Sequence, residues 1–211
     1  MSESTTYMPR FDQSDVDVVD FDVMQEGFFS LERRRFRHAR FDGGMSPEVT
    51  REVHVRHDAV GVILYDPVQD SIVMVEQCRA GALDDEVSPW LIEPVAGLVD
   101  KSEESLEATA RREAEEEAGC QVEDLITLYS YYPSPGACTE KVTLFCALVD
   151  STQLGGVHGL DEENEDIQVH VIAFPTAWEM LMAGRMNNAM AIIGMQWLSK
   201  ERASLRARRN R

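Results

Sequence analysis

The chain has 211 residues, 44% of them hydrophobic and 27% charged, a balance typical of a globular domain. Its formal net charge of −18 disfavours nonspecific binding to nucleic acid or to an anionic membrane surface. Residues 1–4 show no signal-peptide pattern, and the longest nearly uncharged apolar stretch, residues 189–198, is too short to span a bilayer. The four cysteines form no Cys-x-x-Cys pair. We therefore expect a cytoplasmic protein with buried, reduced thiols and with neither nucleic-acid nor membrane partners.

The N-terminal quarter of the chain alternates apolar and charged side chains, the pattern of half-exposed strands. Three segments show it, at residues 15–23, 28–41 and 49–55. Together they contain too few apolar residues to form a core of their own. We expect residues 1–55 to form a small antiparallel β unit that packs on the rest of the chain or on another subunit, beside a main domain at residues 56–211.

The main domain combines buried strands with helices. Near-continuous apolar runs at residues 59–65 and 71–76 indicate strands that are covered on both faces. Further strands are expected at residues 90–94, 125–132, 142–149 and 167–174, a long acidic loop at residues 151–166, and helices at residues 176–183 and 188–202. Strands with helices on either side predict an α/β/α sandwich with a mixed sheet.

The most acidic helix expected in this domain carries two glutamates on its apolar side. At 100° per residue, Glu117 lies about 40° from Glu113, and both continue the stripe formed by Leu106, Ala110 and Ala114. An amphipathic surface helix places apolar residues there, and glutamates at i and i+4 repel each other. A divalent cation turns that repulsion into attraction, and carboxylates suit Mg²⁺ or Mn²⁺. The alternative, a solvated acidic helix, leaves this placement unexplained.

The segment that contains this helix resembles the Nudix box, G-x5-E-x7-R-E-U-x-E-E-x-G-U, in which U is apolar. The positions of the box are filled by Gly97, Glu104, Arg112, Glu113, Ala114, Glu116, Glu117, Gly119 and Cys120. Six residues rather than five separate Gly97 from Glu104, and taking Glu103 in its place lengthens the second gap to eight. The first glutamate of the box is therefore either Glu103 or Glu104.

Nearly the whole chain, from about residue 22 to residue 200, is similar to the bacterial ADP-ribose pyrophosphatases of this family. Pro135 lies 15 residues after Cys120, the spacing typical of that subfamily, and residues 160–166 match its acidic catalytic loop. The resemblance implies a Nudix-type sandwich and hydrolysis of the diphosphate linkage of ADP-ribose to AMP and ribose 5-phosphate, with Mg²⁺ or Mn²⁺ as cofactor. It also implies a homodimer that exchanges its N-terminal β units, so that Phe28 and Arg51 serve the partner's site.

The resemblance assigns roles to individual residues. It implies that metal is held by four of them, the backbone carbonyl of Ala96 and the carboxylates of Glu113, Glu117 and Glu165. It makes Glu163 the general base, with Glu162 as the neighbouring alternative. It implies substrate contacts from Phe28, Phe29, Arg51, Glu52, Arg56, Arg79, Leu98, Ser134, Pro135, Gly136 and Glu140.

Two alternatives to ADP-ribose hydrolysis stay open. The same chemistry on another nucleoside-diphosphate sugar, such as GDP-mannose, needs the same acidic helix. A noncatalytic Nudix-like module that senses ADP-ribose is the alternative from a different class. Such modules usually lose the acidic core, which is complete in this sequence.

Overall fold

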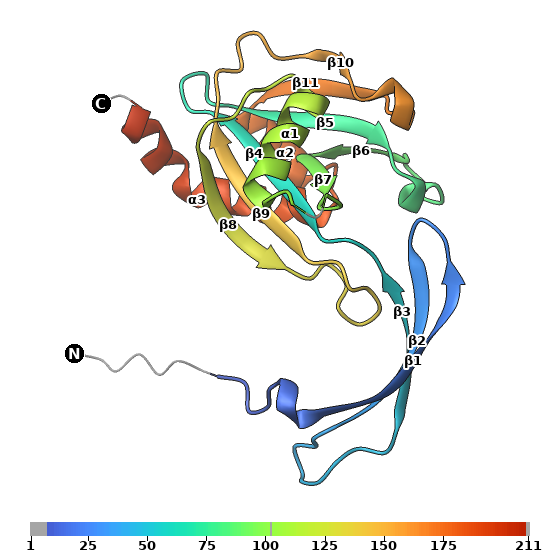
Figure 1. Ribbon diagram of the computed structural model, residues 1–211. Helices are drawn as coiled ribbons and strands as arrows, with labels where there is room; N and C mark the ends of the chain where they lie inside the picture. The colour runs from blue at the N-terminus through green and yellow to red at the C-terminus, as the bar shows by residue number, and fades with distance from the viewer. Residues whose placement is uncertain (1–7, 102, 210–211) are drawn as a thin grey trace, which may run out of the picture. The chain divides into compact units, whose positions relative to one another are not determined.

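The computed structural model describes residues 8–101 and 103–209 (Figure 1). Residues 1–7 of the expected β unit lie outside the described residues. The chain divides into two compact units. The first unit contains the residues up to Arg56 together with Ser134–Glu140, and the second unit contains His57–Pro133 and Lys141–Arg211. The assignment of Ser134–Glu140 to the first unit was not expected from the sequence.

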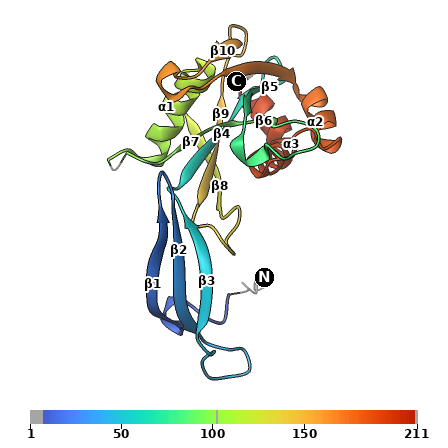
Figure 2. The same cartoon turned by 90° about the vertical axis from the view of Figure 1, so that its right-hand side faces the viewer.

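The first unit is a three-stranded antiparallel sheet in the order β1-β2-β3 (Figure 2). Its strands are β1 (Val16–Glu26), β2 (Ser30–His38) and β3 (Val49–Val55), preceded by a 3-10 turn at Gln13–Asp15. The strands expected at residues 15–23, 28–41 and 49–55 are thus confirmed. The segment Ser134–Glu140 joins β3 through a parallel bridge between His54 and Cys138.

Charge pairing sets the register of this sheet. Arg35 on β2 holds Asp20 of β1 at 2.6 Å and Asp22 at 3.1 Å. A bulge between Val18 and Asp20 shifts the alternation by one residue, so that Phe21 returns to the apolar face. The acidic face of β1 therefore meets the basic face of β2, and the apolar side chains of β1 stay exposed.

The second unit is built on an eight-stranded mixed sheet. Its central path runs β10-β11-β5-β4-β9-β8, with β6 paired to β5 and β7 paired to β4. The strands are β4 (Ala59–Asp66), β5 (Ser71–Cys78), β6 (Trp90–Glu93), β7 (Val95–Leu98), β8 (Leu125–Tyr131), β9 (Val142–Leu148), β10 (Gly156–His158) and β11 (Ile167–Ala173). The β4–β9 pair is parallel, whereas the neighbouring β4–β5 and β8–β9 pairs are antiparallel.

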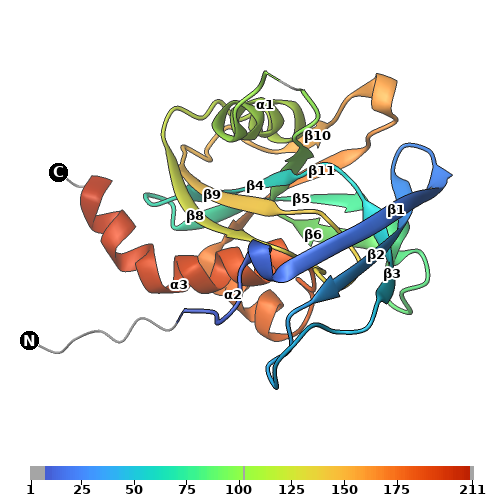
Figure 3. The same ribbon diagram turned by 60° about the horizontal axis from the view of Figure 1, so that its bottom comes forward.

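Helices cover both faces of this sheet (Figure 3). The helix α1 (Leu106–Ala118) lies on one face, and α2 (Phe174–Met182) and α3 (Ala189–Arg209) lie on the other. Alternate residues of β4 divide between the two cores, since Val62 packs with α1 residues and Ile63 packs with α2 and α3 residues. The expected α/β/α sandwich with a mixed sheet is confirmed.

Several details differ from the sequence-based expectations. The strand β7 was not predicted, and β10 together with a 3-10 turn at Asp161–Glu163 lies inside the expected acidic loop. The helix α3 runs past residue 202, because Arg202 and Arg206 both pair with Asp70 on the β4–β5 turn. All four cysteines are free, but only Cys120 and Cys146 are buried, so the expectation of four buried thiols was wrong for the other two. Within the described ranges, no helix combines the length and apolar content needed to cross a membrane.

Candidate active site

Local sequence fixes where α1 begins and ends. The Ser105 side chain accepts a hydrogen bond from the Ala108 N–H at 3.2 Å and so caps the N-terminus. Gly119 adopts a left-handed conformation with φ 59° and donates its N–H to the last turn. Between these ends, Ala110 and Ala114 are fully buried against the sheet. The helix therefore presents the face predicted from the sequence, glutamates included.

Glu117 is the most deeply buried of these glutamates. It is 3% exposed, and its Oε2 accepts a hydrogen bond from the Ala96 N–H on β7 at 3.0 Å. Burial raises the pKa of Glu117 to about 8, and the charges of Glu113 and Glu165 add to the rise. An isolated carboxylate in this position holds a proton near neutral pH, whereas a nearby cation would keep it ionised.

Glu113 lies one turn earlier, against the backbone of β7. A Cβ atom placed on Gly97 would come within 1.9 Å of the Glu113 carboxyl carbon. Glycine is therefore required at residue 97 so that this carboxylate can approach the strand. Burial raises the pKa of Glu113 to about 7, against the opposing charge of Arg112. The sequence motif marked Gly97, but this reason for the glycine was visible only in the structure.

Arg112 connects the acidic residues that surround the pair. Its guanidinium lies 2.8 Å from both Glu113 and Glu116 and 3.2 Å from Glu104. Glu104 also accepts a hydrogen bond from the Thr109 hydroxyl at 3.0 Å. The hydrogen bond from Arg112 lowers the pKa of Glu104. The structure thus makes Glu104, rather than Glu103, the glutamate that partners the arginine of the box.

The acidic loop is anchored to the end of α1. The Gly159 N–H donates to the Glu116 carbonyl at 3.4 Å, and the Leu160 N–H donates to the Glu165 carboxylate at 3.3 Å. Gly159 has φ 105°, and a Cβ atom there would lie 2.7 Å from the Glu165 Cβ. Glu165 is close enough for its charge to raise the pKa of both Glu113 and Glu117, although burial is the larger cause. The acidic loop therefore holds Glu165 close to Glu113 and Glu117.

The two candidate bases lie on the same loop. Glu162 and Glu163 belong to the 3-10 turn Asp161–Glu163, and both are exposed. Asn164 ends the turn with φ 54°, a conformation that asparagine tolerates better than most residues. The geometry does not distinguish the two carboxylates, so the assignment of Glu163 as the base stays a prediction.

Arg79 directly follows β5, which ends at Cys78, and its charge acts against the raised pKa of Glu117. Its Nε donates to the Glu93 carboxylate at 2.5 Å. Glu93 is 5% exposed, and sequence reasoning did not include it among the site residues. A charged residue inside the apolar run at residues 90–95 was the signal that could have found it.

These donors suit a hard divalent cation. Carboxylate and carbonyl oxygens are the ligands that Mg²⁺ and Mn²⁺ prefer. The buried carboxylate of Glu117 and the half-buried carboxylate of Glu113, both with raised pKa values, lie together. Among the described residues, the one hydrogen bond to Glu117 goes to its Oε2 and leaves its Oε1 free for a cation. Among residues 8–101 and 103–209, no three acidic, histidine or cysteine side chains are arranged to enclose a metal ion. A cation held here would therefore complete its coordination with waters or substrate oxygens, as Mg²⁺ usually does.

The first unit gathers three of the predicted substrate contacts. The Arg56 guanidinium lies 4.7 Å from the centre of the Phe29 ring and pairs with Glu140 at 3.1 Å. The ring of His54, which was not predicted, meets the Phe29 ring edge-on at 5.1 Å. The Arg56 Nε is buried and has no hydrogen-bond partner in the described part of the chain. The Arg56 Nε–H is therefore a hydrogen-bond donor that the described residues leave unused.

The remaining predicted contacts are exposed or belong to the second unit. Phe28 is 80% exposed, Arg51 bonds only the neighbouring Thr50 carbonyl at 2.7 Å within the described residues, and Glu52 lies 4.0 Å from Arg33. The turn residues Ser134, Pro135 and Gly136 are exposed. Leu98 belongs to the second unit, half-buried at the end of β7. Their roles in binding stay predictions.

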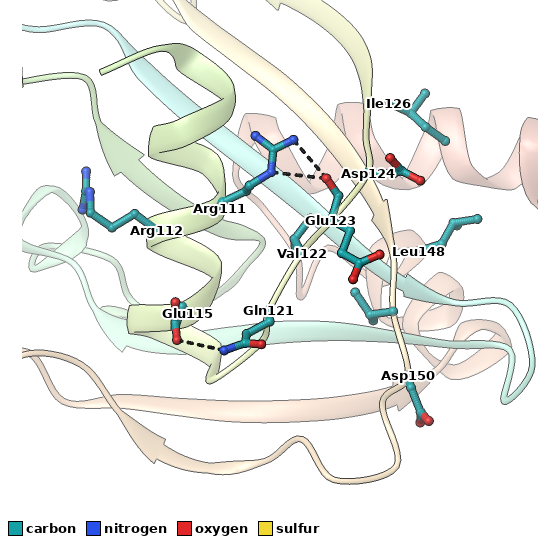
Figure 4. A pocket seen from close by; sticks show the side chains of 11 residues that line it. Arg111, Arg112, Glu115, Gln121, Val122, Glu123, Asp124, Ile126, Leu148 and Asp150 are labelled. Carbon is teal, nitrogen blue, oxygen red and sulfur yellow. Dashed lines mark hydrogen bonds between the residues drawn. The ribbon is translucent and has the colours of Figure 1, made fainter. Parts of the chain in front are cut away.

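A hollow of about 870 Å³ lies on the side of α1 that carries Arg111 (Figure 4). Arg111 donates from Nε and Nη2 to the Glu123 carbonyl at 3.3 and 3.0 Å, and Gln121 reaches Glu115 at 3.4 Å. Neither Glu113 nor Glu117 lines this hollow. Since the perturbed carboxylates lie elsewhere on α1, we place the chemistry at those carboxylates and not in the hollow.

Comparison with known proteins identifies the family of the chain. Residues 55–193 match the NUDIX domain family. The chain is 45% identical over 199 residues to the ADP-ribose pyrophosphatase of Haemophilus influenzae, with 93% of this chain and 91% of the relative covered. It is 30% identical over 177 residues to the GDP-mannose pyrophosphatase of Shigella flexneri, with 83% and 91% covered. A solved structure described as an ADP compounds hydrolase has the same fold, with a TM-score of 0.65 at 17% identity, covering 89% of this chain and 96% of that one.

A mixed sheet between helices, with Glu117 buried and Glu113 half-buried on α1, is the arrangement of a hydrolase of the Nudix type. The chain belongs to the Nudix family. Hydrolases of this family generally depend on a divalent metal ion.

Proposed function

We propose that this protein is an ADP-ribose pyrophosphatase that uses Mg²⁺, with Mn²⁺ as the alternative ion, and acts as a homodimer in the cytoplasm. The substrate proposal is supported by the relative that is 45% identical over 93% of this chain. The observation that carries the chemistry is the pair of Glu117, which is buried, and Glu113, which is half-buried, whose carboxylates have raised pKa values beside the backbone of β7. Two ionised carboxylates held this close destabilise the fold when no cation is bound. With a divalent cation between them, they can hold the ion that activates the substrate.

The reaction is hydrolysis of a phosphoanhydride bond. A water oxygen bonds to one phosphorus while the bridging P–O bond breaks, giving AMP and ribose 5-phosphate. Glu163 accepts the proton of the attacking water from its exposed position on the acidic loop. When bound, the divalent cation supplies positive charge to the diphosphate oxygens. Glu113, Glu117, Glu165 and the Ala96 carbonyl are the groups that would hold it.

Arginines of this chain would bind the negative substrate. Arg79 offers a guanidinium in the second unit, and Arg51 and Arg56 offer guanidinium groups in the first. Phe28, 80% exposed, supplies a flat ring on which adenine could stack. We assign the ribose and remaining phosphate contacts to Leu98, Ser134, Gly136 and Glu140, and a contact with the adenosine to Glu52.

The proposed dimer is supported by the exposure of β1. All eleven residues of that strand are exposed, and among them Val18 is 58%, Phe21 60% and Val23 54% exposed. A row of exposed apolar side chains on a sheet marks an interaction surface. A second copy of this strand is the occupant we propose, so that Phe28 and Arg51 serve the partner's site.

Hydrolysis of another nucleoside-diphosphate sugar is the second candidate, because the relative at 30% identity is a GDP-mannose pyrophosphatase. A substrate panel distinguishes the two. Purified protein with Mg²⁺ is given ADP-ribose, GDP-mannose and other nucleoside-diphosphate sugars, and kcat/KM is ranked. We expect ADP-ribose to rank first, and a higher value for GDP-mannose would contradict the proposal. Binding of ADP-ribose without turnover in Mg²⁺ or Mn²⁺ would instead indicate a noncatalytic module.

A further inference from the structure

Glu93 is a buried carboxylate that the proposed reaction does not use. It ends β6, opposite Val75 of β5, and is 5% exposed. Burial of a carboxylate is costly unless a charged partner satisfies it. The partner is Arg79, whose Nε donates to Glu93 Oε2 at 2.5 Å.

The backbone of Arg79 is fixed as well as its Nε. The Arg79 N–H donates to the Pro89 carbonyl at 2.9 Å, and its own carbonyl accepts from the Ala82 N–H at 2.9 Å. The side chain is nevertheless 37% exposed. In the described part of the chain, its two terminal nitrogens make no hydrogen bond. Glu93 therefore binds the Nε of the guanidinium and leaves the two terminal nitrogens, Nη1 and Nη2, free to bind another group.

The chain itself links the Arg79–Glu93 pair to the carboxylate pair, because Glu93 lies three residues before Ala96, whose N–H donates to the Glu117 carboxylate at 3.0 Å. Burial raises the pKa of Glu117 to about 8, and the charge of Arg79 is one of the influences that oppose this rise. Arg79 is thus near enough to act electrostatically on Glu117. A guanidinium with two free terminal nitrogens can bind a phosphate group through two parallel hydrogen bonds.

We propose that Glu93 is a positioning residue, which holds Arg79 through Nε so that both terminal nitrogens face the substrate diphosphate. The inference rests on the proposed function, because it takes the diphosphate as the group that Arg79 binds. It goes beyond that function by giving a buried residue of β6 a part in substrate affinity.

A double-mutant cycle on the full-length protein tests this role. Glu93→Gln keeps the size of the side chain but replaces a charge-assisted hydrogen bond with a weaker neutral one. We expect KM to rise about tenfold with kcat nearly unchanged, because the contact is made in both ground and transition states. In an Arg79→Ala background the same change should leave KM within about twofold, since Glu93 then has nothing to hold.

Glu76→Gln is the matched control. Glu76 lies on β5, the strand that pairs with β6, and its carboxylate lies 2.7 Å from His170 Nε2. Glu93 is paired with Val75, the residue before Glu76, so the two glutamates lie on opposite faces of the sheet. The Glu76→Gln variant should leave KM unchanged. Equal effects of Glu93→Gln in the two backgrounds, or wild-type KM for the single variant, would overturn the proposal. If Glu93→Gln does not fold, Glu93→Asp keeps the charge and withdraws it from Nε, and the same KM rise is expected.

A second readout separates this inference from the proposed substrate. The Nε–H signal of Arg79 in an NMR spectrum, assigned by its loss in Arg79→Lys, should exchange slowly with water in the wild type and rapidly in Glu93→Gln. Rapid exchange of the Arg79 Nε–H proton in the wild type would contradict a stable hydrogen bond from Arg79 to Glu93. If the wild type does not hydrolyse ADP-ribose, the proposed function fails, and the cycle is run on whichever nucleoside-diphosphate sugar is hydrolysed, because the diphosphate is common to all.

Discussion

The two compact units of this protein bury their strands to opposite extents. Every residue of β4 in the second unit is buried, whereas every residue of β1 in the first unit is exposed. The second unit has enough apolar surface for two cores, one on each face of its sheet. The first unit is held in register by ion pairs such as Arg35–Asp20 and leaves the apolar residues of β1 exposed. The proposed dimer would cover this exposed apolar surface of β1.

This difference matches a division of labour in the proposed function. Catalytic carboxylates must be held within fractions of an ångström, and a packed core provides that precision. Glu113 and Glu117 accordingly lie on a helix that packs against the sheet. Candidate recognition residues such as Phe28 and Arg51 lie in the exposed unit.

The largest effect is expected from the proposed base. Glu163→Gln removes the group that accepts the proton of the attacking water, and we expect kcat to fall by about 10²–10⁴-fold while KM changes little. Initial rates of AMP release measure this. Glu162→Gln, one residue earlier on the same turn, is the control and should retain most activity. The reverse pattern would transfer the role to Glu162.

A loss of similar size, but of a different kind, is expected from Gly97→Ala. The new methyl group would displace the Glu113 carboxylate, from which a Cβ atom would lie only 1.9 Å. Because a carboxylate is the flexible end of a side chain, the fold should tolerate the change. We expect weaker Mg²⁺ binding and about a hundredfold lower activity at fixed Mg²⁺, by analogy with other losses of metal-site geometry. The melting temperature should change little.

The control for this variant is Gly81→Ala, whose Cβ atom would meet nothing within 4 Å. It should match the wild type in Mg²⁺ dependence. Full activity of Gly97→Ala would show that the position of Glu113 against β7 does not matter for the reaction.

A smaller effect is expected in the exposed unit. Phe21→Lys places a charge among the apolar side chains of β1, where Phe21 is 60% exposed. We expect light scattering to show a dimer for the wild type and a monomer for the variant, with activity lowered because Phe28 and Arg51 no longer reach a partner's site. Asp17→Lys, on the acidic face of the same strand, is the control and should remain dimeric. A monomeric, fully active wild type would contradict the proposed exchange.

The smallest effect is expected from Glu117→Gln on the free energy of unfolding. The sign of this effect depends on whether a divalent cation is bound. The pKa values of Glu113 and Glu117, about 7 and about 8, lie above the ordinary value of 4.5, so the folded state holds more protons than the unfolded state between these limits. Without metal, the free energy of unfolding therefore falls as pH rises from 4.5 toward 8. At pH 8 in chelator, Glu117→Gln should melt a few degrees above the wild type. Glu115→Gln, exposed on the same helix, should not, and Mg²⁺ should stabilise only proteins that keep Glu117.

Much of the second unit was predictable because its signals are local. The strands β4 and β5 read as continuous apolar runs, and counting angles along α1 placed Glu113 and Glu117 on the buried side. The strand β7 was missed, since four residues that include a glycine carry too little pattern.

Contacts between distant segments were not predictable from local pattern. Nothing near Ser134 indicates that its segment joins β3 through the bridge between His54 and Cys138. The pairing of Arg202 with Asp70 likewise spans 132 residues, so the end of α3 looked like a basic tail. The motif did not choose between Glu103 and Glu104, and only the position of the Arg112 guanidinium did so.

The central claim is that Glu113 and Glu117, on the sheet-facing side of α1, carry a metal-dependent hydrolysis of ADP-ribose. The most direct measurement follows AMP and ribose 5-phosphate from ADP-ribose with wild type and Glu117→Gln, each in Mg²⁺ and in chelator. We predict equal amounts of both products from the wild type in Mg²⁺ only, and a rate at least about a hundredfold lower from the variant. No AMP from the wild type at high enzyme concentration, or an unchanged rate from Glu117→Gln, would contradict the claim.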